Sequence, residues 1–464
     1  MIKKTLIARS FEALVYNKNG ASYNTLFSYF YPEFITAFLL YAVPFWIEAR
    51  WIGQLRSTAL YSAMGATSQL IHFIIKVGEG VSIGTISLVG YYNGRKEFEK
   101  AGAILRDAFW LTVIVGSFIA FFLYFGSYWI CYVYVPEQLV AIGVPYLRVR
   151  AFNVFLLYLF LGVISFLRAI KNTWAPMVIF IIGLAVLLPI DYLFIFGGCG
   201  LPSYGLLGCA MASIVQYSVM LMCAVVYLCF DEKIKKYKVS LWGVNSKSFI
   251  RLLQISGPVV VDKAMMAFAY IWLCWMMRPM GITAIATFTV LKDMERFALV
   301  PAIASAQVIT FLVSNDYGSG SWESIKVNIK KIVLMASFFV LSILTIFALY
   351  STQIVQFFDK TGDFTDLAVR AFPILSVLVF FDLLQLILSG ALRGAANVTT
   401  VMTTRVIIII GYFMPMSYIL SRLPIESLLL RIVLVYASFY IGNALMSVLY
   451  VQRFQGQEWK KQAI

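Results

Sequence analysis

The chain has 464 residues, of which 61% are hydrophobic and only 13% are charged. A soluble domain carries about 25% charged residues, so this composition and a mean hydropathy of +0.85 exclude a water-soluble globular protein. The net charge of +15 would suit a nucleic-acid partner, but the placement of the basic residues gives it another explanation.

Apolar runs long enough to cross a bilayer recur from Tyr29 to the C-terminus, separated by short polar segments. We therefore predict an all-α polytopic membrane protein with twelve transmembrane helices. In chain order, the predicted helices cover residues 29–52, 57–90, 108–130, 142–166, 173–197, 204–230, 249–277, 282–313, 330–352, 366–392, 398–420 and 427–451.

Lys and Arg residues are concentrated in the predicted loops on one side of the membrane, together with both termini. Because such an excess marks the cytoplasmic face, we predict that both termini are cytoplasmic. The first residues lack the apolar core and small-residue cleavage site of a secretory signal peptide. The positive charge thus reflects membrane topology, and no nucleic-acid partner is expected.

The sequence offers little for catalysis or metal binding. His72 is the only histidine, the cysteines have no metal-ligand spacing, and no HExxH, GxSxG or phosphate-cradling loop is present. We expect neither an enzyme, nor a metal site, nor a cofactor.

An internal repeat divides the chain into two halves. The stretch "LRAIKNT" begins at Leu167 and "LRGAANV" begins at Leu392 (392 − 167, an offset of 225 residues), and several shorter echoes keep nearly the same offset. Two six-helix halves with the same orientation are parallel repeats, an arrangement in which transporters place substrate between the halves. The predicted organisation is a cytoplasmic N-terminal segment (1–28), an N-lobe (29–230), a cytoplasmic linker (231–248), a C-lobe (249–452) and a cytoplasmic tail (453–464).

Several collinear motifs resemble those of the MATE (multidrug and toxic compound extrusion) family. They are "GTISLVGYYNGRKEFEKA", "FLRAIKNTWAPM", "LPIDYLFIFG" with "YGLLGCAMASIVQ", "FTVLKDMERFALVPAIASAQVIT" and "ALRGAANVTTVM". The resemblance spans nearly the whole chain and mixes DinF-like and NorM-like features. It implies two six-helix bundles around a central cavity and a secondary antiporter driven by protons or sodium.

The resemblance implies a cation or proton site in the N-lobe at Glu48, Asp191 and Ser213. Carboxylates inside spans are costly and therefore candidates for function, and the three residues are predicted at comparable depth. The family commonly has Asn one turn before the Asp, where this chain has Leu187, which favours protons over sodium. Alternatively, Glu48 forms an ion pair at the outer rim with Arg50 or Arg56, and Asp191 is structural.

A second candidate site lies in the C-lobe. Asp382 and Gln385 in "FFDLLQLILSG" match the cation site of the NorM-like branch, but Met266 stands where that branch has a Glu. Asp262, one turn earlier, either replaces the missing carboxylate or pairs with adjacent Lys263. These two alternatives remain open.

Other polar residues in the spans have simpler explanations. Arg168 and Arg393 are expected to reach helix-end carbonyls, and Asn172 and Asn397 suit the turn or N-cap that follows. In "KDMER" (Lys292 to Arg296), pairing within the helix is expected. If Lys76, Lys263 and Arg296 face a cavity, anionic or zwitterionic substrates become plausible.

The leading hypothesis is an antiporter that exports amphipathic organic compounds, cationic drugs or toxins in the first place, in exchange for protons or, less favoured, sodium. The alternative is a flippase for a lipid-linked oligosaccharide or other anionic lipid-linked cargo, because intramembrane Lys and Arg would suit phosphates. We expect a monomeric, multi-pass protein of the bacterial cytoplasmic membrane whose partners are the lipid bilayer and a small organic substrate.

Overall fold

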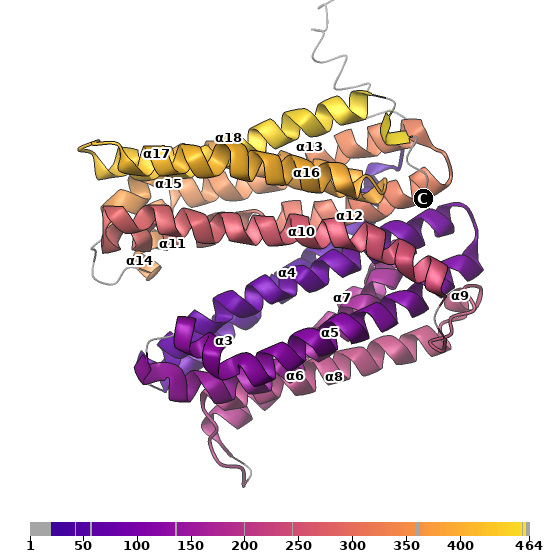
Figure 1. The fold of residues 1–464 in the computed structure, drawn as a ribbon, viewed down its shortest axis with the longest axis horizontal. Helices are drawn as coiled ribbons and strands as arrows, with labels where there is room; N and C mark the ends of the chain where they lie inside the picture. Colours follow the sequence, from indigo (N-terminus) through magenta and orange to yellow (C-terminus); the bar gives the residue numbers. More distant parts are fainter. Residues whose placement is uncertain are drawn as a thin grey trace, which may run out of the picture. The chain divides into compact units, whose positions relative to one another are not determined.

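The computed structural model describes residues 20–41, 43–55, 58–134, 137–198, 200–243, 245–358, 362, 364–456 and 458–460. In these ranges the chain is almost entirely helical (Figure 1). The helices are α2 (Tyr23–Tyr41), α3 (Val43–Gln54), α4 (Thr58–Gly94), α5 (Phe98–Tyr134), α6 (Glu137–Ala169), α7 (Trp174–Phe196), α8 (Leu206–Phe230), α9 (Glu232–Lys235), α10 (Ser246–Met277), α11 (Ile282–Ala298), α12 (Val300–Gly318), α13 (Trp322–Leu349), α14 (Ser351–Phe358), α15 (Thr365–Gly394), α16 (Val398–Ile408), α17 (Met414–Arg422) and α18 (Leu428–Gln455).

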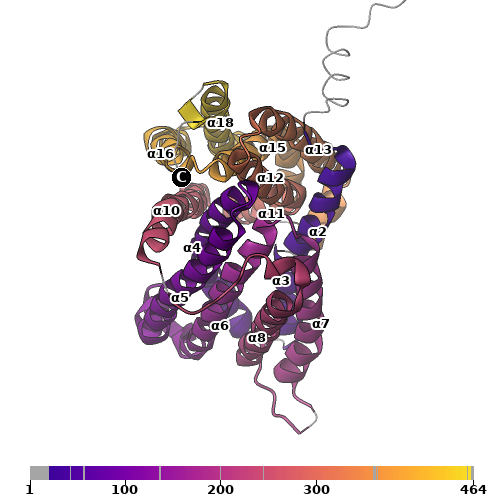
Figure 2. The ribbon, with the colours of Figure 1, turned by 90° about the vertical axis from the view of Figure 1, so that its right-hand side faces the viewer.

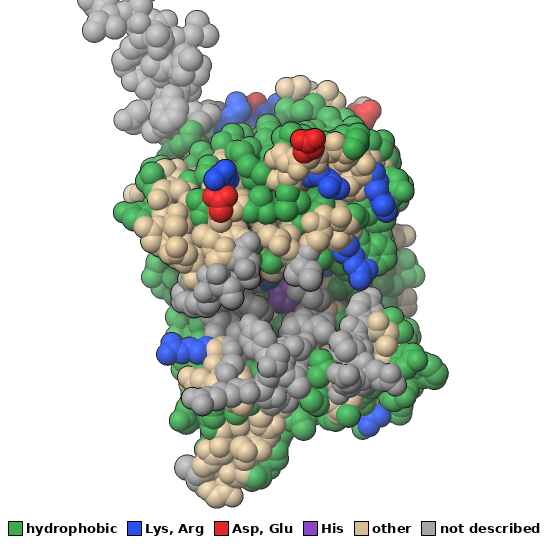
Figure 3. Space-filling view, turned by 90° about the vertical axis from the view of Figure 1, so that its left-hand side faces the viewer, with side chains coloured by type: hydrophobic (Ala, Val, Ile, Leu, Met, Phe, Trp, Pro, Cys, Tyr) green, Lys and Arg blue, Asp and Glu red, His purple; other side chains and the backbone are tan. Residues whose placement is uncertain are grey.

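Each of the twelve predicted spans coincides with a helix or with two consecutive helices. Within the described ranges, ten helical stretches are long and apolar enough to cross a membrane, and α11 and α12 form an eleventh bent by 47°. The first predicted span corresponds to α2 and α3. The prediction of an all-α, multi-pass membrane protein is therefore confirmed, and the broad apolar surface in Figure 3 suits contact with lipid.

The helices form two compact units. One unit contains the described residues up to Phe34 and those from Ala264 onward, and the other contains Ile35–Lys263. The predicted lobes meet at the linker, whereas these units divide inside α2 and α10. Each of these two helices thus contributes one part to each unit.

In the unit of Ile35–Lys263, α4, α5 and α6 pack around a shared apolar core, and α8 packs on both α6 and α7 (Figure 2). Tyr158 on α6 is buried in this core and donates its hydroxyl to the carbonyl of Ile74 over 2.6 Å. Gly78 lets its ring approach α4, because an added Cβ would lie 3.0 Å from the ring. The hydroxyl is therefore satisfied inside an apolar environment.

In the other unit, α12, α15 and α18 form the central packing. Gly394 allows α15 to cross α12 closely, because an added Cβ would lie 2.4 Å from the carbonyl oxygen of Thr310. Between α16 and α17, residues Ile409–Phe413 form a π-helical turn. The span from Val398 to Arg422 is thus continuous but irregular.

The internal repeat is reproduced in the backbone. In "LRAIKNT" the Asn172 amide bonds the carbonyl of Leu167, and in "LRGAANV" the Asn397 amide bonds that of Leu392. Lys171 and Ala396 occupy equivalent positions and both have positive φ, 65° and 55°. Both are αL turns that close a helix. The side chain of Asn172 caps the next helix through the amide of Ala175 at 3.2 Å, as predicted, whereas Asn397 makes no side-chain cap.

The predicted linker is packed against the ends of α4, α5 and α8. Tyr237 donates to Oδ1 of Asn93 at 2.6 Å, and Trp110 donates to the carbonyl of Leu241 at 2.9 Å. Buried Asp107 accepts a hydrogen bond from Ser248 in the first turn of α10. A carboxylate there compensates the positive end of the helix dipole.

Candidate functional site

Four helices bring the predicted N-lobe residues to one level. Ile52, Tyr146, Ile195 and Cys209, from α3, α6, α7 and α8, pack in a single apolar cluster. Each of these four residues has a polar or charged residue four positions away, nearer the middle of its helix. These residues are, in the same order, Glu48, Arg150, Asp191 and Ser213. One helical turn rises about 5.4 Å, so the backbones of these four residues form one layer beneath the cluster.

Asp191 on α7 and Ser213 on α8 lie on neighbouring helices that follow each other in the chain. Asp191 is fully buried, as is Ser213 apart from 2% of its surface. The backbone of Glu48 is helical, but its side chain lies outside the described residues. Its predicted ion pair with Arg50 or Arg56 therefore stays a prediction.

Arg150 is a component of this layer that the sequence did not single out. Its guanidinium donates to Ser213 Oγ at 3.1 Å and to the Tyr146 hydroxyl at 2.8 Å. Ser213 in turn donates to the carbonyl of Cys209 at 3.1 Å. The positively charged guanidinium of Arg150, which donates to the Ser213 oxygen, repels a metal cation from that oxygen. This arrangement is better suited to a proton on a carboxylate than to sodium coordination.

In the C-lobe, both predicted residues on α15 are buried among polar groups. Asp382 Oδ1 accepts a hydrogen bond from Asn443 on α18 at 3.2 Å. Gln385 donates to Ser389 at 3.4 Å, while its Oε1 has no hydrogen-bond partner among the described residues. Both side chains are at least 99% buried, so they form a polar spot within the helix packing.

Glu295 is the second carboxylate of this region, and its hydrogen-bond partners in the described part of the chain lie outside its own helix. The "KDMER" stretch was expected to pair within its helix, but Glu295 Oε2 accepts hydrogen bonds from Tyr436 and Tyr440 on α18. Its Oε1 is buried without a hydrogen-bond partner in the described part of the chain. Tyr440 and Asn443, which donate to Glu295 and Asp382, lie three residues apart on the same helix, α18. The C-lobe thus contains two neighbouring buried carboxylates.

Asp262 belongs to a different unit from Asp382 and Gln385. It is buried in the unit of Ile35–Lys263, near the middle of α10. Its neighbour Lys263 pairs with Glu79 at 3.5 Å. The structure therefore groups Asp262 with the charged residues of α4 and α10, and the suggestion that it completes the Asp382 site stays a prediction.

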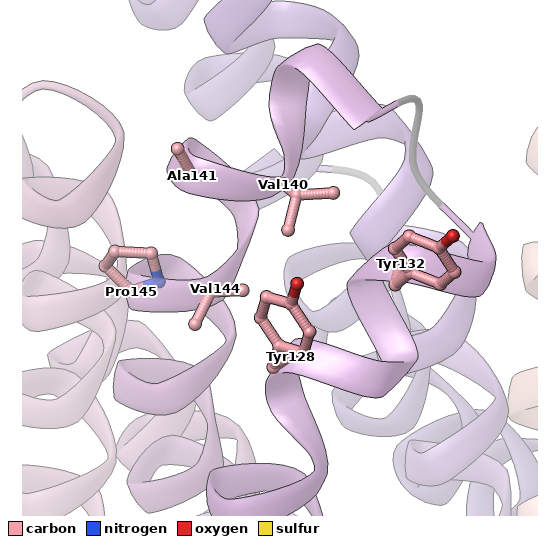
Figure 4. Close-up of a pocket in the computed structure, with 6 residues that line it drawn as sticks. All are labelled: Tyr128, Tyr132, Val140, Ala141, Val144 and Pro145. Atoms are coloured by element: carbon pink, nitrogen blue, oxygen red, sulfur yellow. The ribbon is translucent and has the colours of Figure 1, made fainter.

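A surface hollow of about 430 Å³ lies at one end of α5 and α6. Figure 4 shows its lining by Tyr128, Tyr132, Val140, Ala141, Val144 and Pro145. None of the carboxylates described above borders it. Tyr128 and Tyr132 are more than half exposed, so this is an apolar surface feature distinct from both candidate sites.

The sequence profile of the MatE family matches residues 34–193 and 258–419. The chain is 21% identical over 370 residues to the probable multidrug resistance protein NorM of Pasteurella multocida, covering 79% of this chain and 80% of that protein. It is 23% identical over 351 residues to the multidrug resistance protein NorM of Vibrio cholerae, covering 75% and 76%.

Solved structures show the same architecture. The Vibrio cholerae MATE transporter VcmN in its bent form superposes with a TM-score of 0.83 at 17% identity, over 96% of this chain and 97% of that chain. An outward-facing multidrug resistance transporter of the MATE family and MOP superfamily gives a TM-score of 0.86 at 17% identity, over 97% and 98%. The predicted fold of two helical lobes is confirmed by these similarities.

Proposed function

The chain belongs to the MATE family of membrane transporters, and on that premise we propose that it exports amphipathic organic compounds in exchange for protons. The observation that carries the proposal is the layer of Arg150, Asp191 and Ser213, in which a buried carboxylate lies at the level of a guanidinium bound to the serine. Proteins that it resembles carry names of multidrug resistance proteins, which supports a broad organic substrate range.

Proton coupling follows from the cost of buried charge. An ionised carboxylate in a low-dielectric interior is costly unless a positive charge compensates it, and protonation removes that cost. Arg150 places a positive charge at the level of Asp191 and is anchored to α8 through Ser213, while both carboxylate oxygens of Asp191 are buried and accept no hydrogen bond from the described residues. A proton taken up by Asp191 changes the net charge of this layer, so protonation favours a different packing of α6, α7 and α8.

Transport then requires two conformations with different proton and substrate affinities. A ligand shifts the balance only by its differential affinity for the two states. We propose that the protonated N-lobe favours the conformation that releases substrate outward, and that deprotonation toward the cytoplasm resets the transporter. Export by this route needs no covalent step and no bound cofactor beyond the coupling ion.

The test is transport by purified protein in liposomes loaded with ethidium, a fluorescent organic cation. A proton gradient and a sodium gradient are imposed and collapsed separately. We expect transport that depends on the proton gradient and that falls at least about 10-fold in Asp191→Asn, because an amide cannot take up the proton. Asp366→Asn is the matched control, since Asp366 is exposed on α15 and paired with Arg370 at 2.9 Å.

The C-lobe variants Asp382→Asn and Glu295→Gln locate the coupling site. Loss of proton dependence in these two, with Asp191→Asn unaffected, would move coupling to the C-lobe. Transport driven by sodium alone would contradict the proton proposal while leaving organic-compound export intact.

A further inference from the structure

An exposed arginine lies beside the hollow between α5 and α6. Arg148 stands one helical turn after Val144, which lines the hollow, and residues four apart lie on the same face of a helix. Its Nε donates to Oγ of Ser127 on α5 at 3.2 Å, and Ser127 directly precedes Tyr128 of the lining. The guanidinium thus bridges the two helices at the edge of the hollow.

The positive charge of Arg148 is held by neutral groups. Besides the bond to Ser127, the guanidinium lies over the ring of Tyr124, 5.7 Å from its centroid. Ser127 itself donates to the Tyr124 carbonyl at 2.9 Å, which fixes the orientation of its oxygen. Among the described residues no carboxylate pairs with Arg148, and its Nη1 and Nη2 groups make no hydrogen bond. These two groups are therefore available to an anion from outside the chain.

The acidic residues of the helices packed around Arg148 lie far from it. The only acid of α6 is Glu137, eleven residues away (148 − 137), a rise of about 16 Å. Asp107 lies at the opposite end of α5, where it binds the start of α10. Glu79, the acid of α4, pairs with lysines near the middle of that helix. None of them neutralises the guanidinium.

Arg148 also faces away from the acid of the N-lobe layer. Arg150, two residues further along α6, donates to Ser213 on α8, whereas Arg148 donates to Ser127 on α5. Residues two apart point to nearly opposite sides of an α-helix, because each residue turns it by about 100°. Asp191 is at the level of Arg150, so α6 separates it from Arg148.

The hollow lies at a membrane interface. Trp110 and Trp129 are 19 residues apart on α5 (129 − 110), a rise of about 28 Å, and the hydrocarbon core is about 30 Å thick. Trp110 donates to a carbonyl of the linker. At the other end Trp129 is 70% exposed, next to exposed Tyr128 and Tyr132, and such aromatic belts mark the headgroup level. Arg148 therefore reaches lipid phosphates on the side opposite the linker.

We propose that Arg148 and the hollow between α5 and α6 form a binding site for an anionic phospholipid. The phosphate accepts charge-assisted hydrogen bonds from Nη1 and Nη2 of the guanidinium. An acyl chain occupies the space between Tyr128 and the valines of α6, Val140 and Val144 (Figure 4). The volume of about 430 Å³ falls within the range of about 300–1,000 Å³ that is typical of ligand sites. The inference goes beyond the proposed export function and does not depend on it.

The test measures the binding of single lipids to the purified full chain in detergent by native mass spectrometry. Phosphatidylglycerol and phosphatidylcholine with the same acyl chains are compared, so that the two ligands differ only in the headgroup. We expect the wild type to bind phosphatidylglycerol about 10-fold more tightly or better, because the phosphate of phosphatidylcholine is already neutralised by its own ammonium group.

The variants separate the charge from the hollow. Arg148→Gln should reduce the binding of phosphatidylglycerol to the level of phosphatidylcholine and leave phosphatidylcholine unchanged, whereas Arg148→Lys should retain part of the preference. Ala141→Trp fills the hollow and should weaken the binding of both lipids. Arg422→Gln is the matched control, because Arg422 on α17 is also exposed and lies over the ring of Tyr418 at 5.6 Å, but does not border the hollow. It should leave both constants unchanged.

Each outcome bears on the site. Release of phosphatidylglycerol by Arg148→Gln, with phosphatidylcholine retained, supports it. Equal binding of the two lipids by the wild type overturns it, as does an equal loss of phosphatidylglycerol in Arg148→Gln and Arg422→Gln, which would be a general effect of surface charge. A dimer that Ala141→Trp dissociates, with lipid binding unchanged, would assign the hollow to a second copy of the chain and overturn the lipid site.

Discussion

Arg150 and Glu295 illustrate what single residues add to the sequence-based prediction. Asp191 and Ser213 were predictable because α7 and α8 are long helices joined by a short turn, so their depth follows from counting residues. Besides Tyr146 on its own helix, Arg150 has two partners on α8, Cys209 and Ser213, which lie 59 and 63 residues away. The partners of Glu295 lie 141 and 145 residues away. Such pairings depend on how helices rotate and pack laterally, which hydrophobic periodicity does not specify.

One signal was nevertheless available in the sequence. Glu33, Glu79 and Glu295 all lie inside predicted spans, and all three are buried in the structure. The rule that intramembrane carboxylates are functional candidates applies to them as it does to Asp191. Glu295 forms the contacts of the C-lobe site, and Glu79 pairs with Lys76 and Lys263.

A prediction at this scale concerns Asp231. Its carboxylate accepts hydrogen bonds from the Tyr227 hydroxyl and the Lys233 amide, which lower its pKa below the ordinary value of 3.8. It therefore stabilises the fold above that value, and the contribution is lost as pH falls through the lowered pKa. Tyr227→Phe should lower the melting temperature at neutral pH, and its difference from the wild type should shrink below about pH 4.

Melting temperatures in detergent between about pH 3 and pH 7 check this expectation. Tyr227→Phe also loses the hydrogen bond from Asn172 at 2.8 Å, which contributes about 1 kcal/mol independently of pH. When Asp231→Asn is also present, the effect of Tyr227→Phe on the melting temperature should no longer depend on pH. A constant difference at every pH would show that Asp231 does not sense this hydroxyl.

At the scale of the elements, the repeated turns show why the helix boundaries beside them were predicted closely. "LRAIKNT" and "LRGAANV" close their helices with the same hydrogen bonds and the same positive φ, so a local motif encodes a local structure. The bend between α11 and α12 and the packed linker were not predicted. The packed linker depends on contacts between segments far apart in the sequence, such as that of Tyr237 with Asn93. The bend lies beside Pro301, in the first turn of α12.

Close helix crossings give the second prediction. Gly394→Ala should destabilise the protein by about 2 kcal/mol or more, because the added methyl group overlaps a backbone carbonyl that cannot rotate away. Gly257→Ala is the matched control, since Gly257 is also helical but has no heavy atom within 4 Å of the added Cβ. That change should be neutral or stabilising by up to about 1 kcal/mol.

Unfolding by denaturant in detergent, followed by the circular dichroism of the helices, compares the two variants. Equal stability of Gly394→Ala and Gly257→Ala would show that α12 and α15 separate at little cost. The comparison thus measures how tightly the centre of the second unit is packed.

At the scale of the whole molecule, each compact unit contains a piece from the other half of the sequence. The start of α2 packs in the unit from Ala264 onward, where Asn328 and Lys331 bind the backbone of Ala21 at 2.9 Å. The first part of α10 packs in the other unit, where Ser248 donates to Asp107 and Lys263 pairs with Glu79. The duplication was visible in the sequence, but this exchange was not, because both helices read as uninterrupted spans.

Because each compact unit contains a segment from both halves of the sequence, we expect the two halves to associate without a covalent linker. Fragments 1–243, carrying an affinity tag, and 244–464, without one, should copurify from detergent after coexpression. Removing the exchanged pieces, so that the fragments begin at residues 35 and 264, should lower the recovery. Unchanged recovery of the shortened pair would show that the exchanged segments are dispensable for association.

The π-helical turn at Ile409–Phe413 changes the register between the two copies of the duplicated sequence. A π-helical turn contains one residue more than the α-helical turn it replaces. Equivalent residues of the two copies are therefore 225 positions apart before this turn and 226 positions apart after it. Pro189, Asp191 and Tyr192 then align with Pro415, Ser417 and Tyr418. Ser417 is fully buried and accepts a hydrogen bond from Trp272 at 3.0 Å. With this offset the proline and the tyrosine of the two copies align, but only the first copy has a carboxylate between them.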